Sequence, residues 1–197
     1  DYFQEQVRVR CKRSDQNITP HQYWGLHREK IKRETSDPSA QREILYKEYY
    51  ECTTFKPSLL VGMAKFFDSF RVLDISSGWG DRLIGAIASS ECYSGTDPNK
   101  ALQPGYHEII NFFGVTPIDF KVQPTTFEAV KIDRKKEFDL VLTSPPYFNL
   151  EEYSGVKIGG SVNEWVENFL RVSLEKASDA LVTEGYMVIN INDPPKG

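Results

Sequence analysis

From residue 70 onward, two patterns of apolar positions follow each other in turn. Short apolar runs bounded by turn-forming residues predict buried strands, and longer runs with apolar residues three or four positions apart predict helices. The predicted strands span 71–75, 92–96, 119–122, 138–143 and 186–191. The predicted helices between them span 81–89, 100–113 and 161–179. Because strands and helices alternate, we predict an α/β fold in which a mostly parallel sheet carries helices on both faces.

The pattern before residue 70 predicts helices alone. Thr19 is suited to cap the first of them, and Pro20 suits its first turn. The predicted helices span 20–33, 39–51 and 58–68. We therefore divide the chain into a helical N-terminal extension, residues 1–53, and an α/β domain, residues 54–197.

Charge is distributed unevenly along the chain. Residues 1–33 carry eight Lys or Arg and four Asp or Glu, which gives this segment a net charge of +4. The whole chain has a net charge of −4, so the remaining residues carry −8. The basic segment is either solvated surface or a contact for the phosphates of a nucleic acid.

Length and composition exclude several classes of protein. A chain of 197 residues, 40% hydrophobic and 26% charged, has the composition of a globular protein with a core of its own. No apolar run approaches the roughly 20 residues needed to cross a bilayer. The N-terminus has no signal-peptide pattern, so an intracellular location is expected. The three cysteines lack metal-binding spacing, and we expect no metal site.

A turn with two glycines joins the first predicted strand to the next helix. Because glycine has no side chain, the backbone at Gly78 and Gly80 is able to approach a ligand closely. Open parallel sheets bind ligands at the carboxyl ends of their strands. A dinucleotide-binding turn requires a third glycine, and Leu83 stands at that position. Asp74, at the end of the strand, would repel a pyrophosphate and is suited to pair with a ligand's ammonium group or with waters around that group.

A second acidic residue ends the next predicted strand. Asp97 follows Asp74 by 23 residues, and an acid at this place is able to accept hydrogen bonds from both hydroxyls of a ribose. An Asp in this position also caps helices, which is the alternative role. Trp79, inside the glycine turn, either lines a ligand pocket or packs on the following helix. The glycine turn and the second acid together favour an adenosine-containing ligand.

The sequence Ser144-Pro145-Pro146-Tyr147-Phe148 directly follows the fourth strand. Two prolines stiffen the backbone and remove two amide donors, while their carbonyls still accept hydrogen bonds. The Ser hydroxyl adds an acceptor, and the two aromatic rings offer flat faces for stacking. This combination suits a planar base that carries an exocyclic amino group. Holding that amine in line with a methyl donor would be catalysis by positioning.

Residues 54–195 resemble the amino-methyltransferases of the class I, Rossmann-like methyltransferase fold. The matching segments are the glycine turn 74–80, the acid Asp97, the catalytic motif 144–147 and the segment 54–57 before a helix. The resemblance implies S-adenosylmethionine as cofactor and methyl transfer to an amino group of a nucleic-acid base. It implies catalytic roles for Ser144, Pro145, Pro146 and Tyr147, and substrate binding by Tyr147, Phe148 and Asn149. It implies cofactor binding by Lys56, Pro57, Asp74, Ser76, Gly78, Trp79, Gly80, Asp97 and Pro98.

The acceptor stays open at this point. Ser at the first catalytic position resembles the cytosine-N4 branch of the family, whereas Asp is more usual in the adenine-N6 branch. DNA is the expected partner, and RNA guanine N2 or a protein glutamine are the alternative acceptors. A methyltransferase fold without activity that binds nucleic acid is a further alternative. Since the chain ends soon after the fifth predicted strand, we expect the family's last two strands to be missing from it.

Overall fold

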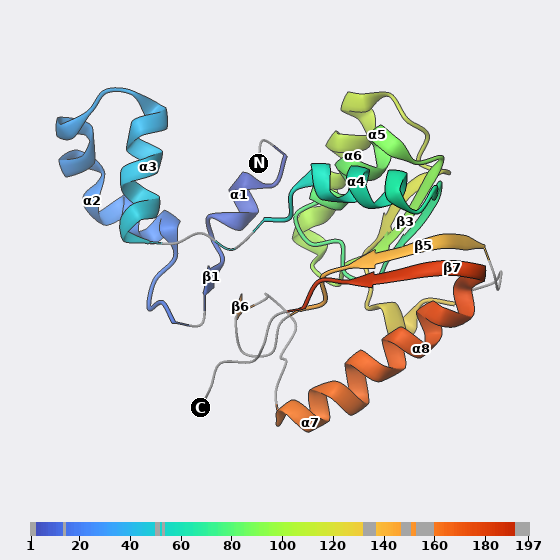
Figure 1. Cartoon of the computed structure of the whole chain (residues 1–197). Coiled ribbons are helices and arrows are strands. Elements are labelled where there is room, and N and C mark those ends of the chain that lie inside the picture. The colour runs from blue at the N-terminus through green and yellow to red at the C-terminus, as the bar shows by residue number, and fades with distance from the viewer. Residues whose placement is uncertain are drawn as a thin grey trace.

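A parallel sheet forms the centre of the molecule (Figure 1). The computed structural model describes residues 3–13, 15–49, 52, 54–131, 137–146, 151–152 and 160–191. Within these residues the sheet has five strands, and each strand is parallel to its neighbours. In their order across the sheet they are β4 (Phe120–Gln123), β3 (Cys92–Thr96), β2 (Arg71–Asp74), β5 (Phe138–Thr143) and β7 (Leu181–Ile189).

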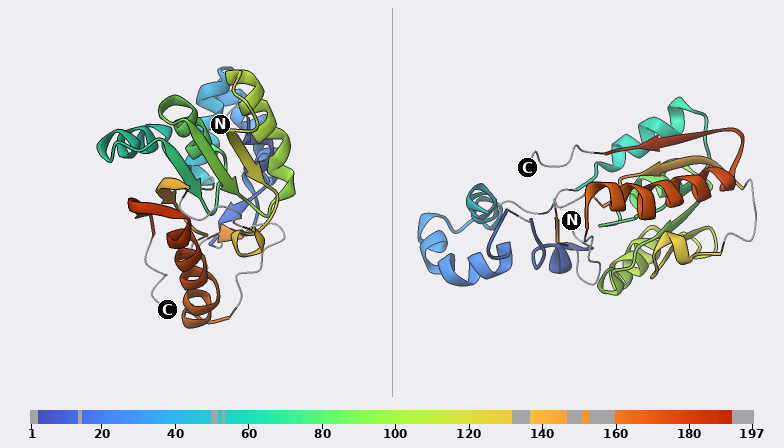
Figure 2. Two further views of the ribbon diagram at one scale, coloured as in Figure 1. Left: turned by 90° about the vertical axis from the view of Figure 1, so that its right-hand side faces the viewer. Right: turned by 90° about the horizontal axis from the view of Figure 1, so that it is seen from below.

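Helices cover both faces of this sheet (Figures 1 and 2). Consecutive strand residues point to opposite faces. Accordingly, Val72 packs in one cluster with Leu60 of a covering helix, while Leu73 packs in a second cluster with Ala177 of another. The first cluster includes residues of α4 (Pro57–Phe66), α5 (Asp81–Ser89) and α6 (Gln103–Phe113), and the second includes residues of α8 (Arg171–Ala180) and the short 3-10 helix Phe127–Ala129. The predicted α/β architecture is confirmed.

Local sequence accounts for most element boundaries. The helix predicted at 81–89 and the strands predicted at 92–96 and 138–143 have the predicted bounds. The helix predicted over 100–113 begins as a 3-10 turn, Lys100–Leu102, and continues as α6. The helix predicted over 161–179 is α7 (Val162–Trp165), a π-helical stretch (Val166–Leu170) and α8 in succession.

The start of the last strand was predicted five residues too late. β7 begins at Leu181, directly after α8, and not at 186. Glu184 adopts a positive φ of 66°, and the pairing of β5 with β7 shifts register between Phe138 and Leu140. From the sequence alone, Glu184-Gly185 has the composition of a turn, which is why the strand was predicted to begin after it. In the structure, pairing with β5 includes both residues in β7 as an irregularity of the strand.

The described residues before position 50 form four elements. They are α1 (Glu5–Arg8), β1 (Lys12–Arg13), α2 (Pro20–Glu34) and α3 (Pro38–Glu48). Thr19 caps α2 as predicted, and its side chain and that of Gln22 each accept a hydrogen bond from the other residue's backbone N–H. α1 and β1 were not predicted. β1 pairs antiparallel with β6 (Glu151–Glu152), which follows the predicted catalytic motif.

Strand order locates the edge at which a ligand is expected. From β2 the chain proceeds to β3 and β4 on one side, and later places β5 and β7 on the other side. The loops after β2 and β5 therefore leave the carboxyl edge of the sheet in diverging directions. In open α/β sheets, ligands bind at the place where the strand order reverses in this way.

Candidate functional site

The turn after β2 depends on two glycines with different roles. Gly78 and Gly80 have φ of 56° and 86°, a region that residues with side chains rarely adopt. A Cβ on Gly80 would lie 2.8 Å from Cδ1 of Ile109, so this glycine allows the turn to pack against α6. A Cβ on Gly78 would meet no atom within 4 Å. The backbone at Gly78 is therefore accessible to a ligand.

Asp74 organises the turn from inside the protein. Its side chain is fully buried, and its Oδ2 accepts hydrogen bonds from Arg82 Nε at 2.7 Å and Tyr93 OH at 2.6 Å. Its Oδ1 accepts from Thr143 Oγ1 at 3.0 Å and from the backbone N–H of Ser76 at 3.1 Å. The cation that faces this carboxylate in the structure is Arg82, and the cofactor role expected for Asp74 stays a prediction.

Arg82 ties the turn to the segment before α4. Its guanidinium donates to the carbonyl of Ser76 and lies over the ring of Phe55, 4.9 Å from the ring centroid. Burial alone would lower the pKa of Arg82, but the charge and hydrogen bond of Asp74, together with the neighbouring tyrosines, outweigh it, and the pKa is raised. Phe55 also donates its backbone N–H to Asp81, the first residue of α5. Arg82 and Asp74 therefore form a charged core beneath the turn.

The two predicted loops lie side by side. Ser76 Oγ donates to the carbonyl oxygen of Ser144 at 3.0 Å and lies 2.9 Å from Thr143 Oγ1. β2 and β5 pair directly, with Val72 opposite Leu140, so both loops begin at the same edge of the sheet. The sequence-based expectation that the glycine turn adjoins the Ser-Pro-Pro segment is confirmed.

Asp97 connects the loop after β3 to the glycine turn. Its Oδ2 accepts the backbone N–H of Gly78 at 2.9 Å, and its Oδ1 accepts that of Asn99 at 2.9 Å. Burial raises the pKa of Asp97 to about 6, although both backbone hydrogen bonds act in the opposite direction. Each carboxylate oxygen has a further lone pair, so this geometry leaves acceptor capacity beside the accessible face of Gly78.

The raised pKa of Asp97 predicts a specific pH dependence of stability. An unfolded Asp titrates near pH 3.9, so the folded protein binds the proton of Asp97 more tightly than the unfolded chain does. The stability that this bound proton supplies is lost as pH rises from about 4 to about 6. Asp97→Asn does not titrate there. We therefore compare the free energies of unfolding of Asp97→Asn and of the original protein by urea denaturation. Between pH 4 and pH 7 the difference should shift in favour of the variant by at most about 3 kcal/mol. A difference independent of pH would contradict the raised pKa.

The other predicted cofactor residues flank the same turn. Lys56 is exposed and precedes α4, and Pro57 occupies its first position. A Cβ on Gly85 would lie 2.6 Å from the Pro57 carbonyl oxygen, so α4 packs closely on α5. Trp79 is half-buried and packs against the core cluster of α4, α5 and α6, while Pro98 is half-buried after β3. Their cofactor roles stay predictions.

The catalytic motif is described only in part. Ser144 and Pro146 are half-buried and Pro145 is buried, directly after β5. Tyr147, Phe148 and Asn149 lie outside the described residues. The acceptor role of Ser144 and the stacking roles of Tyr147 and Phe148 therefore stay predictions.

Three residues that hold the glycine turn in place were not predicted from the sequence. Arg82 occupies a buried position in the helix beside Leu83, and a cation at such a position requires a buried partner. Tyr93 donates to Asp74, and the hydroxyl of Tyr106 in α6 donates to the carbonyl of Gly78. Burial raises the pKa of both tyrosines well above its ordinary value, so they act as neutral donors. The signal for all three was a polar group within an apolar pattern.

No protein-family model and no curated protein matches the sequence, whereas solved structures share its fold. An rRNA methylase from Streptococcus thermophilus has a TM-score of 0.53 and 13% identity, over 74% of this chain and 76% of that one. The tRNA (m1A58) methyltransferase TrmI from Aquifex aeolicus has a TM-score of 0.51 and 12% identity, over 70% of this chain and 47% of that one. The fold is that of the class I methyltransferases.

A third structure extends this comparison. An S-adenosylmethionine-dependent methyltransferase from Clostridium acetobutylicum has a TM-score of 0.50 and 15% identity, over 69% of this chain and 49% of that one. The chain thus spans about half the length of two of these methyltransferases and three quarters of the rRNA methylase. At these identities the likeness concerns the fold.

Two further observations concern the described part of the chain. None of its helices combines the length and the apolar character that crossing a lipid bilayer requires. Its His, Cys, Asp and Glu residues form no group of three or more placed to hold a metal ion.

Proposed function

We propose that this chain is the catalytic domain of an S-adenosylmethionine-dependent methyltransferase that acts on an exocyclic amino group of a nucleic-acid base. The observation that carries the proposal is the contact between Ser76 and Ser144. Methyl transfer requires donor and acceptor at adjoining sites. The hydrogen bond from Ser76 Oγ to the carbonyl oxygen of Ser144 holds the glycine turn and the Ser-Pro-Pro segment together at one edge of the sheet.

The residues of the glycine turn fit the cofactor. The open side of Gly78 provides a surface on which a nucleoside could lie, and Asp97 beside it is an acceptor for ribose hydroxyls. Asp74 contributes indirectly, because it fixes the turn through Arg82 and the backbone of Ser76. When bound, S-adenosylmethionine would supply an electrophilic methyl group.

The Ser-Pro-Pro segment would hold the acceptor amine. Ser144 Oγ and the carbonyl of Pro145 are acceptors for two amino hydrogens, which leaves the nitrogen lone pair to point at the methyl group. Ser76 fixes the carbonyl of Ser144 and so orients the start of this segment. Catalysis would come from alignment, with no covalent bond between enzyme and base.

DNA is the acceptor we propose, with cytosine N4 or adenine N6 as the methylated atom. The Ser at position 144 supports cytosine, and the planar stacking faces expected from Tyr147 and Phe148 suit either base. In a duplex, the target base must leave the stack to reach such a segment, and aromatic side chains would replace part of the lost stacking.

A methyl-transfer assay tests the reaction and its acceptor together. We expect labelled methyl groups from S-adenosylmethionine to appear in DNA and to be recovered as N4-methylcytosine or N6-methyladenine after digestion to nucleosides. RNA and a protein mixture are assayed in parallel, because label in guanine N2 or in glutamine would move the acceptor to the alternative classes. Calorimetry with S-adenosylmethionine and NAD is the control for the cofactor. Binding of NAD alone would refute the proposed function.

A further inference from the structure

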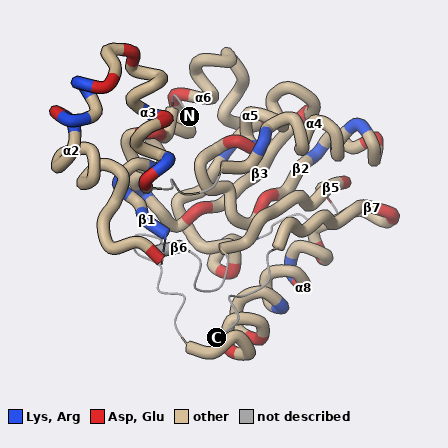
Figure 3. Tube along the Cα trace, turned by 60° about the vertical axis from the view of Figure 1, so that its left-hand side comes forward, with Lys and Arg blue, Asp and Glu red and all other residues tan. Residues whose placement is uncertain are grey.

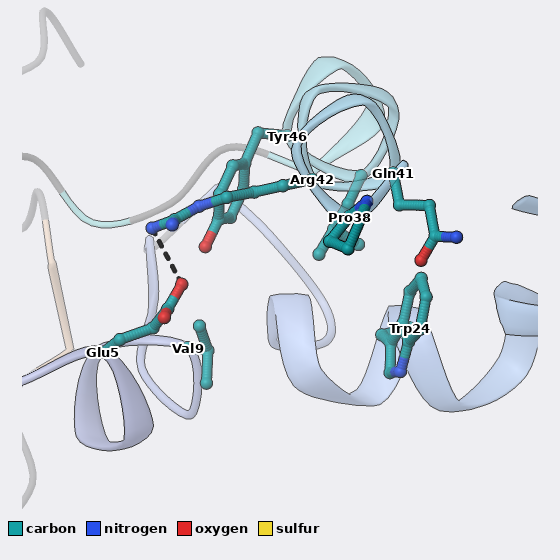
Figure 4. A pocket seen from close by; sticks show the side chains of 8 residues that line it. Glu5, Val9, Trp24, Pro38, Gln41, Arg42 and Tyr46 are labelled. Atoms are coloured by element: carbon teal, nitrogen blue, oxygen red, sulfur yellow. Dashed lines mark ion pairs between the residues drawn. The ribbon is translucent and has the colours of Figure 1, made fainter. Parts of the chain in front are cut away.

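A pocket lies outside the candidate methyl-transfer site, between α1, α2 and α3. It has a volume of about 320 Å³, enough for one nucleotide. Figure 4 shows Trp24 and Gln41 on one side of it, and Glu5, Arg42 and Tyr46 on the other. It thus combines aromatic rings with polar groups able to contact the edge of a base.

The polar groups of this pocket are held in place. Arg42 is ion-paired with Glu5 at 2.7 Å and lies over the ring of Tyr46, 5.5 Å from its centroid. The side-chain amide of Gln41 donates to the carbonyl oxygen of Thr35 at 2.8 Å, which fixes its orientation. A ligand would therefore meet ordered polar groups.

The short helix α1 joins this pocket to the α/β domain. Gln4, directly before this helix, and Arg8, its last residue, are almost completely buried. Gln4 donates to the carbonyl oxygen of Leu102 in the domain at 2.9 Å, and Arg8 donates to that of Cys52, two residues before the domain, at 3.5 Å. One position further along, Glu5 and Val9 line the pocket. Residues four apart share a helix face, so α1 presents one side to the domain and the adjacent side to the pocket.

The charges around the pocket favour a polyanion. α2 carries four Lys or Arg against two Glu, whereas residues 35–197 carry a net charge of −7 (Figure 3). Arg28 lies one helical turn after Trp24 and is exposed. Single-stranded nucleic acid is bound by aromatic rings on which bases stack and by cations that follow the backbone, and Trp24 and Arg28 supply one of each on the same helix.

We propose that this pocket binds one nucleotide of a single-stranded nucleic acid, with its base against Trp24 and its phosphate toward Arg28. The inference rests on the proposed function, because it gives the methylated nucleic acid a second point of attachment. The strand would then be held at the methyl-transfer edge and at the α2–α3 pair at once.

The test measures binding of a fluorescently labelled single-stranded oligodeoxynucleotide of mixed sequence. Fluorescence anisotropy is recorded as the protein is added, in the absence of cofactor. Trp24→Ala should weaken binding about five- to a hundredfold, the range found when one stacked base loses its ring. Trp24→Phe keeps a ring and should stay within a few-fold of the original protein. Arg28→Ala should weaken binding and lessen its dependence on salt. Leu26→Ala is the matched control, since this side chain on the same helix is 72% exposed and does not line the pocket.

Calorimetry with S-adenosylmethionine shows whether each variant keeps its fold and its cofactor site. Equal oligonucleotide binding by Trp24→Ala and the original protein would overturn the pocket proposal, and nucleic-acid methylation would still stand if the methyl-transfer assay found it. Trp24-dependent binding without methyl transfer would support the pocket and count against the reaction. Absence of any oligonucleotide binding by the original protein would overturn the pocket proposal.

Discussion

Replacing Arg82 with Met is expected to lower the free energy of unfolding by about 3–5 kcal/mol, the usual cost of removing one partner from a buried ion pair. Arg82 faces Asp74 at 2.7 Å, and both side chains are buried. Without the guanidinium, the carboxylate keeps its hydrogen bonds from Tyr93, Thr143 and the backbone of Ser76, but loses the one from Arg82 together with its counter-charge. Urea denaturation measures the loss. Affinity for S-adenosylmethionine should fall as well, because Arg82 also holds the carbonyl of Ser76 in the turn.

The matched control is Arg71→Met in β2, the strand that also carries Asp74. Arg71 is 41% exposed and its Nε lies 3.8 Å from an oxygen of Asp139, so its loss should cost less than about 1 kcal/mol. A double variant, Asp74→Asn with Arg82→Met, should recover part of the stability, because no unpaired charge remains buried. Equal losses in Arg82→Met and Arg71→Met would show that the buried pair does not stabilise the turn.

Replacing Tyr147 with Ala is expected to reduce the rate of methyl transfer on the order of 100-fold, as misplacement of a reacting group typically does. The expectation rests on the catalytic motif and on the position of Ser144, beside the glycine turn. Affinity for S-adenosylmethionine should stay within a few-fold, since the proposed cofactor contacts come from the turn and from Asp97. Single-turnover kinetics and calorimetry measure the two quantities separately.

Asp97→Ala provides the opposite case. It removes the carboxylate that accepts the N–H of Gly78, so cofactor affinity should weaken clearly at pH 7. At saturating cofactor, its rate of methyl transfer should recover more than that of Tyr147→Ala. Unchanged turnover in Tyr147→Ala would refute the stacking role given to this ring.

Local sequence motifs identified some residues of the candidate site and missed others. Gly78, Asp97 and Ser144 were all found from the sequence, because each ends or follows a strand and belongs to a recognisable local motif. The partners of Asp74 were not found. Tyr93 comes from β3 and Thr143 from β5, and only the pairing of these strands with β2 brings them together.

By itself the sequence determined the order of most elements and most of their ends, as at Thr19 and the glycine turn, because caps, turns and apolar periodicity act within a few residues. Tertiary structure alone decided three other matters: the cation that faces Asp74, the early start of β7, and the attachment of α1 to the α/β domain. Each depends on which distant segments share a buried surface. Burial forces polar groups there to find partners within the protein, so those partners are chosen by packing rather than by neighbours in the chain.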